Sequence, residues 1–279
     1  MIRLVVDSSA DFPKKELQDR EIEMVPLTIC LNDVSYLDGC DITCDELYDW
    51  LMKSTENFPK TSQPSPQAFA QIFEEAKENG DEVVCILLSS ALSGTFQSAQ
   101  IAKDMVAYDN VHIIDSLTAT HMIRILADYA DHMRRNGSTA AQIVTAIEDL
   151  KSKVKAFAAL DTLEYLHRGG RLSRAAAAVG TLANLKPIIT VSPAGTVTVP
   201  AKCMGRNKTI SFLMNKIGEL DIDYTFPLYS VYTYGTENAA LLEQKLKENN
   251  YHVTERVQIG ATIGSHVGPG ACGFIYVEK

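Results

Sequence analysis

Residues 81–107, DEVVCILLSSALSGTFQSAQIAKDMVA, contain the change of pattern that decides the fold. DEVVCILL is an apolar run of strand length, and TFQSAQIAKDMVA has helical spacing, with Phe96, Ile101 and Met105 expected on its buried face. SSALSGT lies between them and is rich in hydroxyl side chains. The stretch therefore predicts a strand, a polar turn and a helix, with the hydroxyls gathered at the turn.

The same pattern recurs through the first half of the chain. VVDSSAD (5–11), LLSSALS (87–93) and IIDSLTA (113–119) each place Ser or Asp directly after an apolar strand. The carboxyl ends of parallel strands meet at one edge of a sheet, and ligands of open α/β sheets bind there. These junctions predict a parallel sheet with a polar rim. EIEMVPLTICL (21–31) is interpreted as one further strand.

The second half has a different pattern, with short strands, a hairpin turn SPAGT (192–196) and three helices around 173–183, 207–219 and 236–249. This favours a mixed sheet. The prediction is an α/β protein of two domains, an N-terminal parallel α/β sheet domain at 1–155 and a C-terminal mixed-sheet α/β domain at 156–279.

The net charge of −9 is unevenly distributed along the chain. Residues 1–155 carry a charge of −11 and residues 156–279 a charge of +2, which argues against nucleic acid as a general partner. Between Tyr165 and Ile210 there are seven Lys and Arg residues and no Asp or Glu. This segment is either a solvated basic face or a site for an anionic ligand or an acidic partner.

Several classes of protein do not fit the sequence. No run approaches the ~18 apolar residues of a membrane span, and MIRLVVDSSAD lacks the long apolar region of a signal peptide. The six cysteines are scattered, unlike the disulfide framework of a small secreted chain. Neither a metal-ligand spacing nor a Walker A or G-x-G-x-x-G loop is present. We therefore expect a cytoplasmic protein with no metal, no cofactor and no stable membrane insertion.

KTSQPSP (60–66) combines hydroxyls with two prolines. Ser65 followed by Pro66 is typical of the start of a helix, with Ser65 as the N-cap. Thr61 and Ser62 precede that start and are the better candidates to meet a ligand.

HRGGRLSR (167–174) places Arg168 and Arg171 on either side of two glycines. Exposed backbone amides together with guanidinium groups favour an anion clamp. The alternative is a glycine turn that leads into the next helix, with Ser173 as its cap.

SHVGPGACG (265–273) places His266 before a Gly-Pro-Gly turn. A single histidine is more often a hydrogen-bonded structural residue than a catalyst. The three glycines that follow it indicate a close approach of the backbone to another group.

Taken together and in this order, these stretches resemble the DegV family. The resemblance extends over the whole chain and rests on eight collinear segments, which are VVDSSADFP, TSQPSP, SSALSGTFQSA, VHIIDS, DTLEYLHRGGRLSR, LKPII, GRNK and HVGPGACG. Members of that family resemble the fatty-acid-binding subunit of bacterial fatty acid kinase. The resemblance implies a buried acyl tunnel with the fatty acid carboxylate near the junction of the two domains.

The resemblance also implies a function and a set of residues. A non-enzymatic carrier would present a long-chain fatty acid to a separate kinase subunit, which makes the acyl phosphate used in phospholipid synthesis. The positions that match the family's carboxylate site are Thr61, Ser62, Ser93, Gly94 and His266, with Arg171 as a positive contributor.

The segment that matches the family's kinase-facing region is KCMGRNK, which gives Lys202 and Arg206 as the partner-facing residues. It carries fewer basic residues than the family commonly has there.

Two other functions are compatible with the residues. A serine hydrolase would use Ser93 as the nucleophile and His266 as the base, with Asp115 orienting the histidine, although SSALSGT lacks the G-x-S-x-G motif. A phosphate- or nucleotide-binding enzyme would use the RGGR loop, but no nucleotide motif accompanies that loop.

Overall fold

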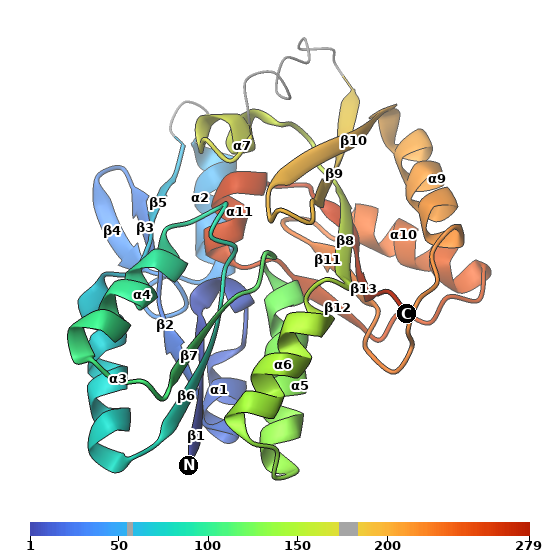
Figure 1. Ribbon diagram of the computed structural model, residues 1–279. Helices are drawn as coiled ribbons and strands as arrows, with labels where there is room; N and C mark the ends of the chain where they lie inside the picture. The colour runs from blue at the N-terminus through green and yellow to red at the C-terminus, as the bar shows by residue number, and fades with distance from the viewer. Residues whose placement is uncertain (55–57, 173–183) are drawn as a thin grey trace.

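The computed structural model describes residues 1–54, 58–172 and 184–279 (Figure 1). A four-stranded sheet in the order β2-β1-β6-β7, here called the parallel sheet, is parallel throughout. Its strands are β1 (Ile2–Asp7), β2 (Ile22–Val25), β6 (Glu82–Leu87) and β7 (Val111–Asp115). The three polar junctions follow β1, β6 and β7, which are adjacent, so the predicted polar rim of a parallel sheet is confirmed.

Helices cover both faces of the parallel sheet, which explains why its strands are continuous apolar runs. Alternate residues of β6 enter different clusters, Val83 and Cys85 with α3 and α4, and Val84 and Ile86 with α5 and α6. The helices are α1 (Lys14–Arg20), α3 (Pro66–Asn79), α4 (Thr95–Val106), α5 (His121–Arg135) and α6 (Ala140–Leu150), with a 3-10 turn η1 (Ser8–Ala10) after β1. Ser65 caps α3 as predicted.

The buried face predicted for α4 is wrong. Ile101 and Met105 are 41% and 56% exposed, whereas Ala99 and Ala102 are fully buried. The small residues of α4 let the helix pack closely on α3 and the sheet, and the larger apolar side chains are left outside. No helix among the described residues is long and apolar enough to cross a membrane.

A six-stranded sheet in the order β10-β9-β8-β13-β11-β12, here called the mixed sheet, forms the second half. Only its β11–β12 pair is parallel, so the predicted mixed sheet and the SPAGT hairpin between β9 and β10 are confirmed. The strands are β8 (Val154–Ala159), β9 (Leu185–Val191), β10 (Val197–Met204), β11 (Tyr229–Tyr232), β12 (Glu255–Gln258) and β13 (Cys272–Val277).

Two helices, α9 (Gly205–Gly218) and α10 (Glu237–Glu248), cover the outer face of the mixed sheet (Figure 1). The helix predicted at 173–183 and the cap predicted at Ser173 lie outside the described residues. The domain boundary near residue 155 stays a prediction.

A three-stranded sheet in the order β4-β3-β5, here called the small sheet, was not predicted. It contains β3 (Thr28–Leu31), β4 (Val34–Leu37) and β5 (Lys60–Ser62), and α2 (Cys44–Lys53) follows β4. The single strand predicted over 21–31 is therefore wrong, because the chain leaves the parallel sheet at Pro26 and pairs again in the small sheet. Proline has no N–H with which to continue a ladder.

Helix α11 (Ala261–Val267), from the end of the chain, packs on elements from its beginning. It contacts α2, β3, β5 and η1, and also the short helix α7 (Glu164–Arg168), as Figure 1 shows near the centre of the molecule. This packing brings the C-terminal segment that carries His266 onto the small sheet that carries Thr61.

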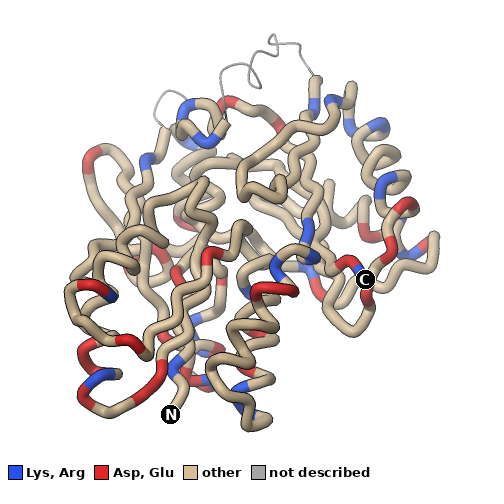
Figure 2. The backbone as a smooth tube through the Cα atoms, viewed as in Figure 1, with Lys and Arg blue, Asp and Glu red and all other residues tan. Residues whose placement is uncertain are grey.

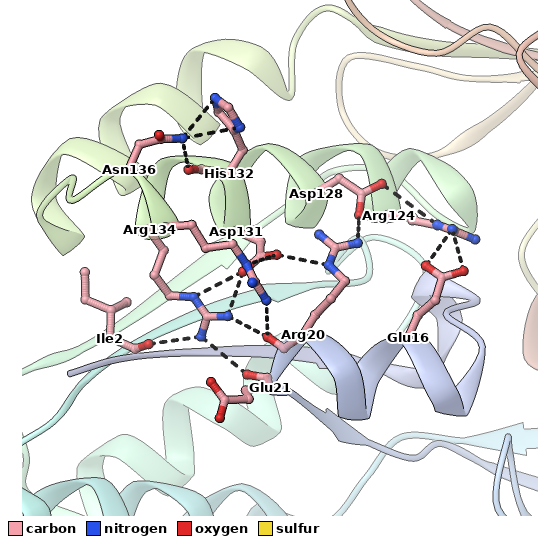
Figure 3. Close-up of polar contacts among 11 residues, drawn as sticks. Ile2, Glu16, Arg20, Glu21, Arg124, Asp128, Asp131, His132, Arg134 and Asn136 are labelled. Atoms are coloured by element: carbon pink, nitrogen blue, oxygen red, sulfur yellow. Dashed lines mark hydrogen bonds and ion pairs between the residues drawn. The ribbon is translucent and has the colours of Figure 1, made fainter.

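An ion-pair network joins α1 and α5, which both pack on the parallel sheet (Figure 3). The Asp131 carboxylate, 4% exposed, accepts hydrogen bonds from Arg20 at 3.0 Å, Arg134 at 2.6 Å and Arg135 at 3.0 Å. Burial opposes ionisation of this carboxyl, but the hydrogen bonds from Arg134 and Arg20 outweigh it and lower the pKa of Asp131. The network stabilises the fold most at neutral pH and loses that contribution as acid protonates Asp131.

An Asp131→Ala variant should lower the free energy of unfolding by about 2 kcal/mol at pH 7, because three guanidinium groups lose a shared, largely buried partner. Urea unfolding measures the change. Asp149→Ala is the control, because Asp149 is 78% exposed and its pair with Lys153 spans 3.8 Å, so its removal should change stability by less than about 0.5 kcal/mol. Equal effects of the two substitutions would contradict a structural role for the network.

Candidate functional site

A cavity lies between the parallel sheet and the mixed sheet, with α11 along one side. Most of its wall is apolar and comes from both halves of the chain, for example Leu88 and Met122 from the first half and Val231 and Ile275 from the second. Seven polar residues also line it, namely Thr61, Ser93, Thr120, Arg171, Thr190, Thr262 and His266. An apolar cavity with a few convergent polar groups is typical of a ligand site.

Four of these polar residues are candidates from the sequence, and here they are called the head cluster. Thr61 lies on β5, Ser93 between β6 and α4, Arg171 just after α7, and His266 on α11. The Thr61 hydroxyl and His266 Nε2 are 2.7 Å apart, and the Ser93 hydroxyl is 2.8 Å from that of Thr95. Segments that are far apart in the sequence thus converge at one part of the cavity wall.

Arg171 joins two of the loops that form the head cluster. Its Nε donates to the Leu92 carbonyl at 2.9 Å, and its Nη1 donates to the Gly169 carbonyl at 2.6 Å. Burial lowers the pKa of Arg171, but an arginine stays charged at physiological pH. The cavity therefore has a fixed positive charge beside Ser93, which follows Leu92.

His266 is held in a neutral form. Burial, followed by the positive charge of Arg171, lowers the pKa of His266 to about 4. Its Nδ1 is buried and has no hydrogen-bond partner among the described residues. A β-carbon at Gly169 would come within 2.2 Å of that nitrogen, so the imidazole packs directly on the glycine backbone.

The His266 imidazole should stay unprotonated from pH 8 to pH 5, because protonation would bury a second positive charge beside Arg171. Two-dimensional proton–nitrogen NMR of the histidine side chains measures this directly. A histidine-containing model peptide, which titrates near ~6.5, is the control for the same measurement. A midpoint near 6.5 for His266 would contradict the proposed burial of the neutral ring.

The structure does not support the serine hydrolase. His266 contacts Thr61 rather than an acid, and Asp115 accepts hydrogen bonds from the backbone amides of Ser90 and Leu117, both at 3.1 Å. The nucleophile, base and orienting acid of that hypothesis are therefore not connected.

The anion clamp expected from HRGGRLSR stays a prediction. Arg168 pairs with Glu164 at 2.9 Å and lies 4.1 Å from the Phe58 ring centroid. Of the two arginines that flank the glycines, only Arg171 lines the cavity.

The other candidates lie outside the cavity wall. Ser62 is exposed, and Gly94 lies against the side chain of Gln63. Lys202 on β10 and Arg206 on α9 are both exposed, and Arg206 donates to the Glu237 carbonyl at 2.6 Å. Figure 2 shows Lys and Arg on α7 and along α9, whereas Asp and Glu gather mainly on the N-terminal half.

Three polar lining residues, Thr120, Thr190 and Thr262, were not identified from the sequence. Thr120 donates to Asp11 at 2.5 Å, and Thr262 donates to Asp38 at 2.6 Å. Thr120 lies four residues after the IIDS segment at the end of β7, so the pattern of polar residues at the strand ends could have identified it. No signal in the sequence pointed to Thr262, which lies one turn before His266.

The model of the DegV family of uncharacterised proteins matches residues 1–279, the whole chain. The chain belongs to the DegV family. A DegV domain-containing protein of Caldanaerobacter subterraneus subsp. tengcongensis is 34% identical over an alignment of 281 positions, which covers 100% of this chain and 99% of the relative.

Solved structures of DegV proteins share the fold over its full length. A fatty-acid-binding DegV family protein of Thermus thermophilus is 30% identical, with a TM-score of 0.88, and the match covers 100% of this chain and 99% of the other. A stearic-acid-binding protein of Eubacterium ventriosum is 27% identical, with a TM-score of 0.89 and the same coverage. The family and the α/β fold expected from the sequence are therefore confirmed.

Proposed function

We propose that this DegV-family protein binds one long-chain fatty acid, with its acyl chain in the cavity and its carboxylate at the head cluster. The observation that carries the proposal is a largely apolar cavity whose wall includes Thr61, Ser93, Arg171 and His266 together. The fatty acids bound by the similar proteins of Thermus thermophilus and Eubacterium ventriosum support it.

The acyl chain supplies most of the affinity in this proposal. Burial of about 14 methylene groups at ~0.8 kcal/mol each gives an upper limit of about 11 kcal/mol before the cost of ordering the ligand. A charge-assisted hydrogen bond to the carboxylate adds about 1.5–3 kcal/mol. The tail therefore supplies most of the affinity, and the head cluster adds a smaller part and fixes the orientation of the ligand.

A neutral His266 allows the Thr61 hydroxyl to donate a hydrogen bond to the ligand. A neutral imidazole carries one N–H, and with that proton on Nε2 it donates to the Thr61 oxygen 2.7 Å away. The Thr61 hydroxyl proton is then free to donate to the ligand carboxylate. This tautomer also leaves Nδ1 without a proton, which fits a buried nitrogen that has no hydrogen-bond partner in the part of the chain that the structure describes. Ser93 supplies a second hydroxyl and Arg171 a positive charge.

In the same proposal the protein is a carrier and not the catalyst. Hydroxyls and a guanidinium group hold a carboxylate without attacking it, and a separate kinase subunit would phosphorylate the bound acid to acyl phosphate. The exposed Lys202 and Arg206 are the residues we assign to that partner. They lie outside the cavity wall, so partner contact and ligand binding are separable.

Mass spectrometry of the organic extract from freshly purified, undenatured protein tests the binding. We expect one stoichiometric fatty acid, and its mass reports chain length and unsaturation. An empty extract, repeated after incubation with a fatty acid mixture, would refute the proposal. Heat-denatured protein taken through the same incubation is the control for non-specific lipid.

The carrier role is tested with loaded protein, ATP and a fatty acid kinase catalytic subunit, with acyl phosphate trapped by hydroxylamine. Product should require both proteins. An Arg206→Ala variant should retain its fatty acid and lose product formation. Product formed without the kinase would show an intrinsic activity and contradict the carrier role.

A further inference from the structure

The first turn of α11 is tied to the loop after β4 through one buried carboxylate. Asp38, 4% exposed, accepts a hydrogen bond from the Thr262 hydroxyl at 2.6 Å and another from the Thr262 backbone amide at 3.3 Å. A carboxylate that is bound to both the side chain and the backbone of one residue fixes the position of that turn.

Asp38 is itself held by the polar junction after β1. The Ser8 hydroxyl donates to the same Asp38 oxygen at 2.9 Å, and the Ser8 oxygen accepts from the Leu27 amide at 3.0 Å. The Asp38 amide donates to the Leu27 carbonyl at 2.9 Å. Asp38 therefore connects α11 to the edge of the parallel sheet. Ser8 of VVDSSAD contributes to this connection and is not part of the head cluster.

A second contact prevents α11 from sliding along its axis. The Tyr48 hydroxyl of α2 donates to the Ile259 carbonyl at 2.8 Å, and a β-carbon at Gly264 would lie 2.3 Å from that hydroxyl. Thr262 and His266 are four residues apart, so they lie on one face of the helix, separated by a single turn. A shift of the Thr262 turn is transmitted directly to the imidazole.

We propose that Asp38 is a positioning residue for the head cluster, which sets the place of His266 against Thr61 by fixing the first turn of α11. The proposal rests on the proposed function, because it concerns the carboxylate end of the fatty acid. Asp38 does not line the cavity, and it acts through Thr262 and the helix. Its loss should therefore weaken recognition of the carboxylate and leave the acyl part of the site in place.

The test compares hexadecanoate with hexadecan-1-ol, which share a tail and differ in the head group. Delipidated wild-type protein should bind the acid more tightly than the alcohol. Asp38→Ala should reduce that preference roughly tenfold, about the effect of losing one charge-assisted hydrogen bond. Asp41→Ala is the matched control, since Asp41 accepts from Leu37 within the same loop and does not reach α11, and it should leave the preference unchanged.

A double-mutant cycle with His266→Ala separates positioning from general destabilisation. If Asp38 acts through His266, Asp38→Ala should cause no further loss of preference in the His266→Ala background. Asp38→Asn should restore most of the preference, because the amide oxygen can accept the same three hydrogen bonds. Burial raises the pKa of Asp38 to about 6, so measurements at pH 7.5 compare a carboxylate with an amide.

Thr262→Val gives a second route if Asp38→Ala does not fold, because it keeps the shape of Thr262 and removes only the hydroxyl bond. It should reduce the preference about threefold to tenfold. Equal losses for acid and alcohol in the folded variants, or additive losses in the cycle, would overturn the positioning role. Failure of the wild-type protein to bind hexadecanoate would instead refute the proposed function.

Discussion

An Ala156→Phe variant should bind long-chain fatty acids more than 100-fold more weakly than the wild-type protein. Ala156 lies on β8, and its side chain lines the cavity. A phenyl ring there would occupy the space of about four methylene groups of the ligand, or ~3 kcal/mol of burial. The ring would fill space that the ligand otherwise uses, so the ligand-free protein should be no less stable.

Thermal unfolding with and without hexadecanoate measures this effect. Fatty acid at about ten times the wild-type Kd should raise the melting temperature of the wild-type protein and shift that of Ala156→Phe far less. Phe157→Leu is the control, because Phe157 lies on the same strand and packs on the opposite side, against the cluster under α9 and α10. A normal ligand-induced shift in Ala156→Phe would show that the acyl chain lies elsewhere.

A Gly169→Ala variant should lose roughly 50-fold to 100-fold in affinity for fatty acid. Its new methyl group would come within 2.2 Å of His266 Nδ1 and 3.0 Å of the Tyr165 carbonyl, so the imidazole has to move. That movement breaks the contact between His266 and Thr61, and about one to two charge-assisted hydrogen bonds to the carboxylate are lost with it.

Isothermal titration with hexadecanoate measures this loss, and circular dichroism checks the fold. Gly170→Asn is the matched control. Gly170 has a φ of +72°, which asparagine tolerates better than other residues, and no described residue lies within 4 Å of its β-carbon position. If the two variants bound fatty acid equally well, the head cluster would not depend on the position of His266.

The parallel sheet was predictable because three of its four strands, β1, β6 and β7, are largely apolar and end in a polar turn. The pattern is present in the sequence of each of β1, β6 and β7 and the turn that follows it. It therefore predicts both the sheet and the edge at which its polar turns gather. The buried face of α4 was not predictable in this way. Which side of α4 is buried depends on how closely the helix lies to α3 and the sheet. The close approach there buries the small Ala99 and Ala102 and leaves the larger Ile101 and Met105 exposed.

The head cluster was predictable only through the resemblance to the DegV family. Thr61 and His266 are 205 residues apart, and no periodicity in the sequence relates them. The hydrogen bonds of Arg171 could not be predicted from the sequence for a different reason. Its partners are the carbonyls of Leu92 and Gly169, and a backbone carbonyl is present at every position of the chain. Only the path of the loops selects those two.

The packing of α11 has a consequence for how the protein is made. The hydrogen bonds from Thr262 to Asp38 and between Thr61 and His266 close loops of more than 200 residues, which are among the slowest contacts to form in a folding chain. Residues 1–150 emerge from the ribosome long before α11 is synthesised, and their parallel sheet can pair without it. The nascent chain thus exposes one apolar wall of the cavity until α11 is made. A product truncated before α11 would therefore lack one side of the cavity while it retains the parallel sheet.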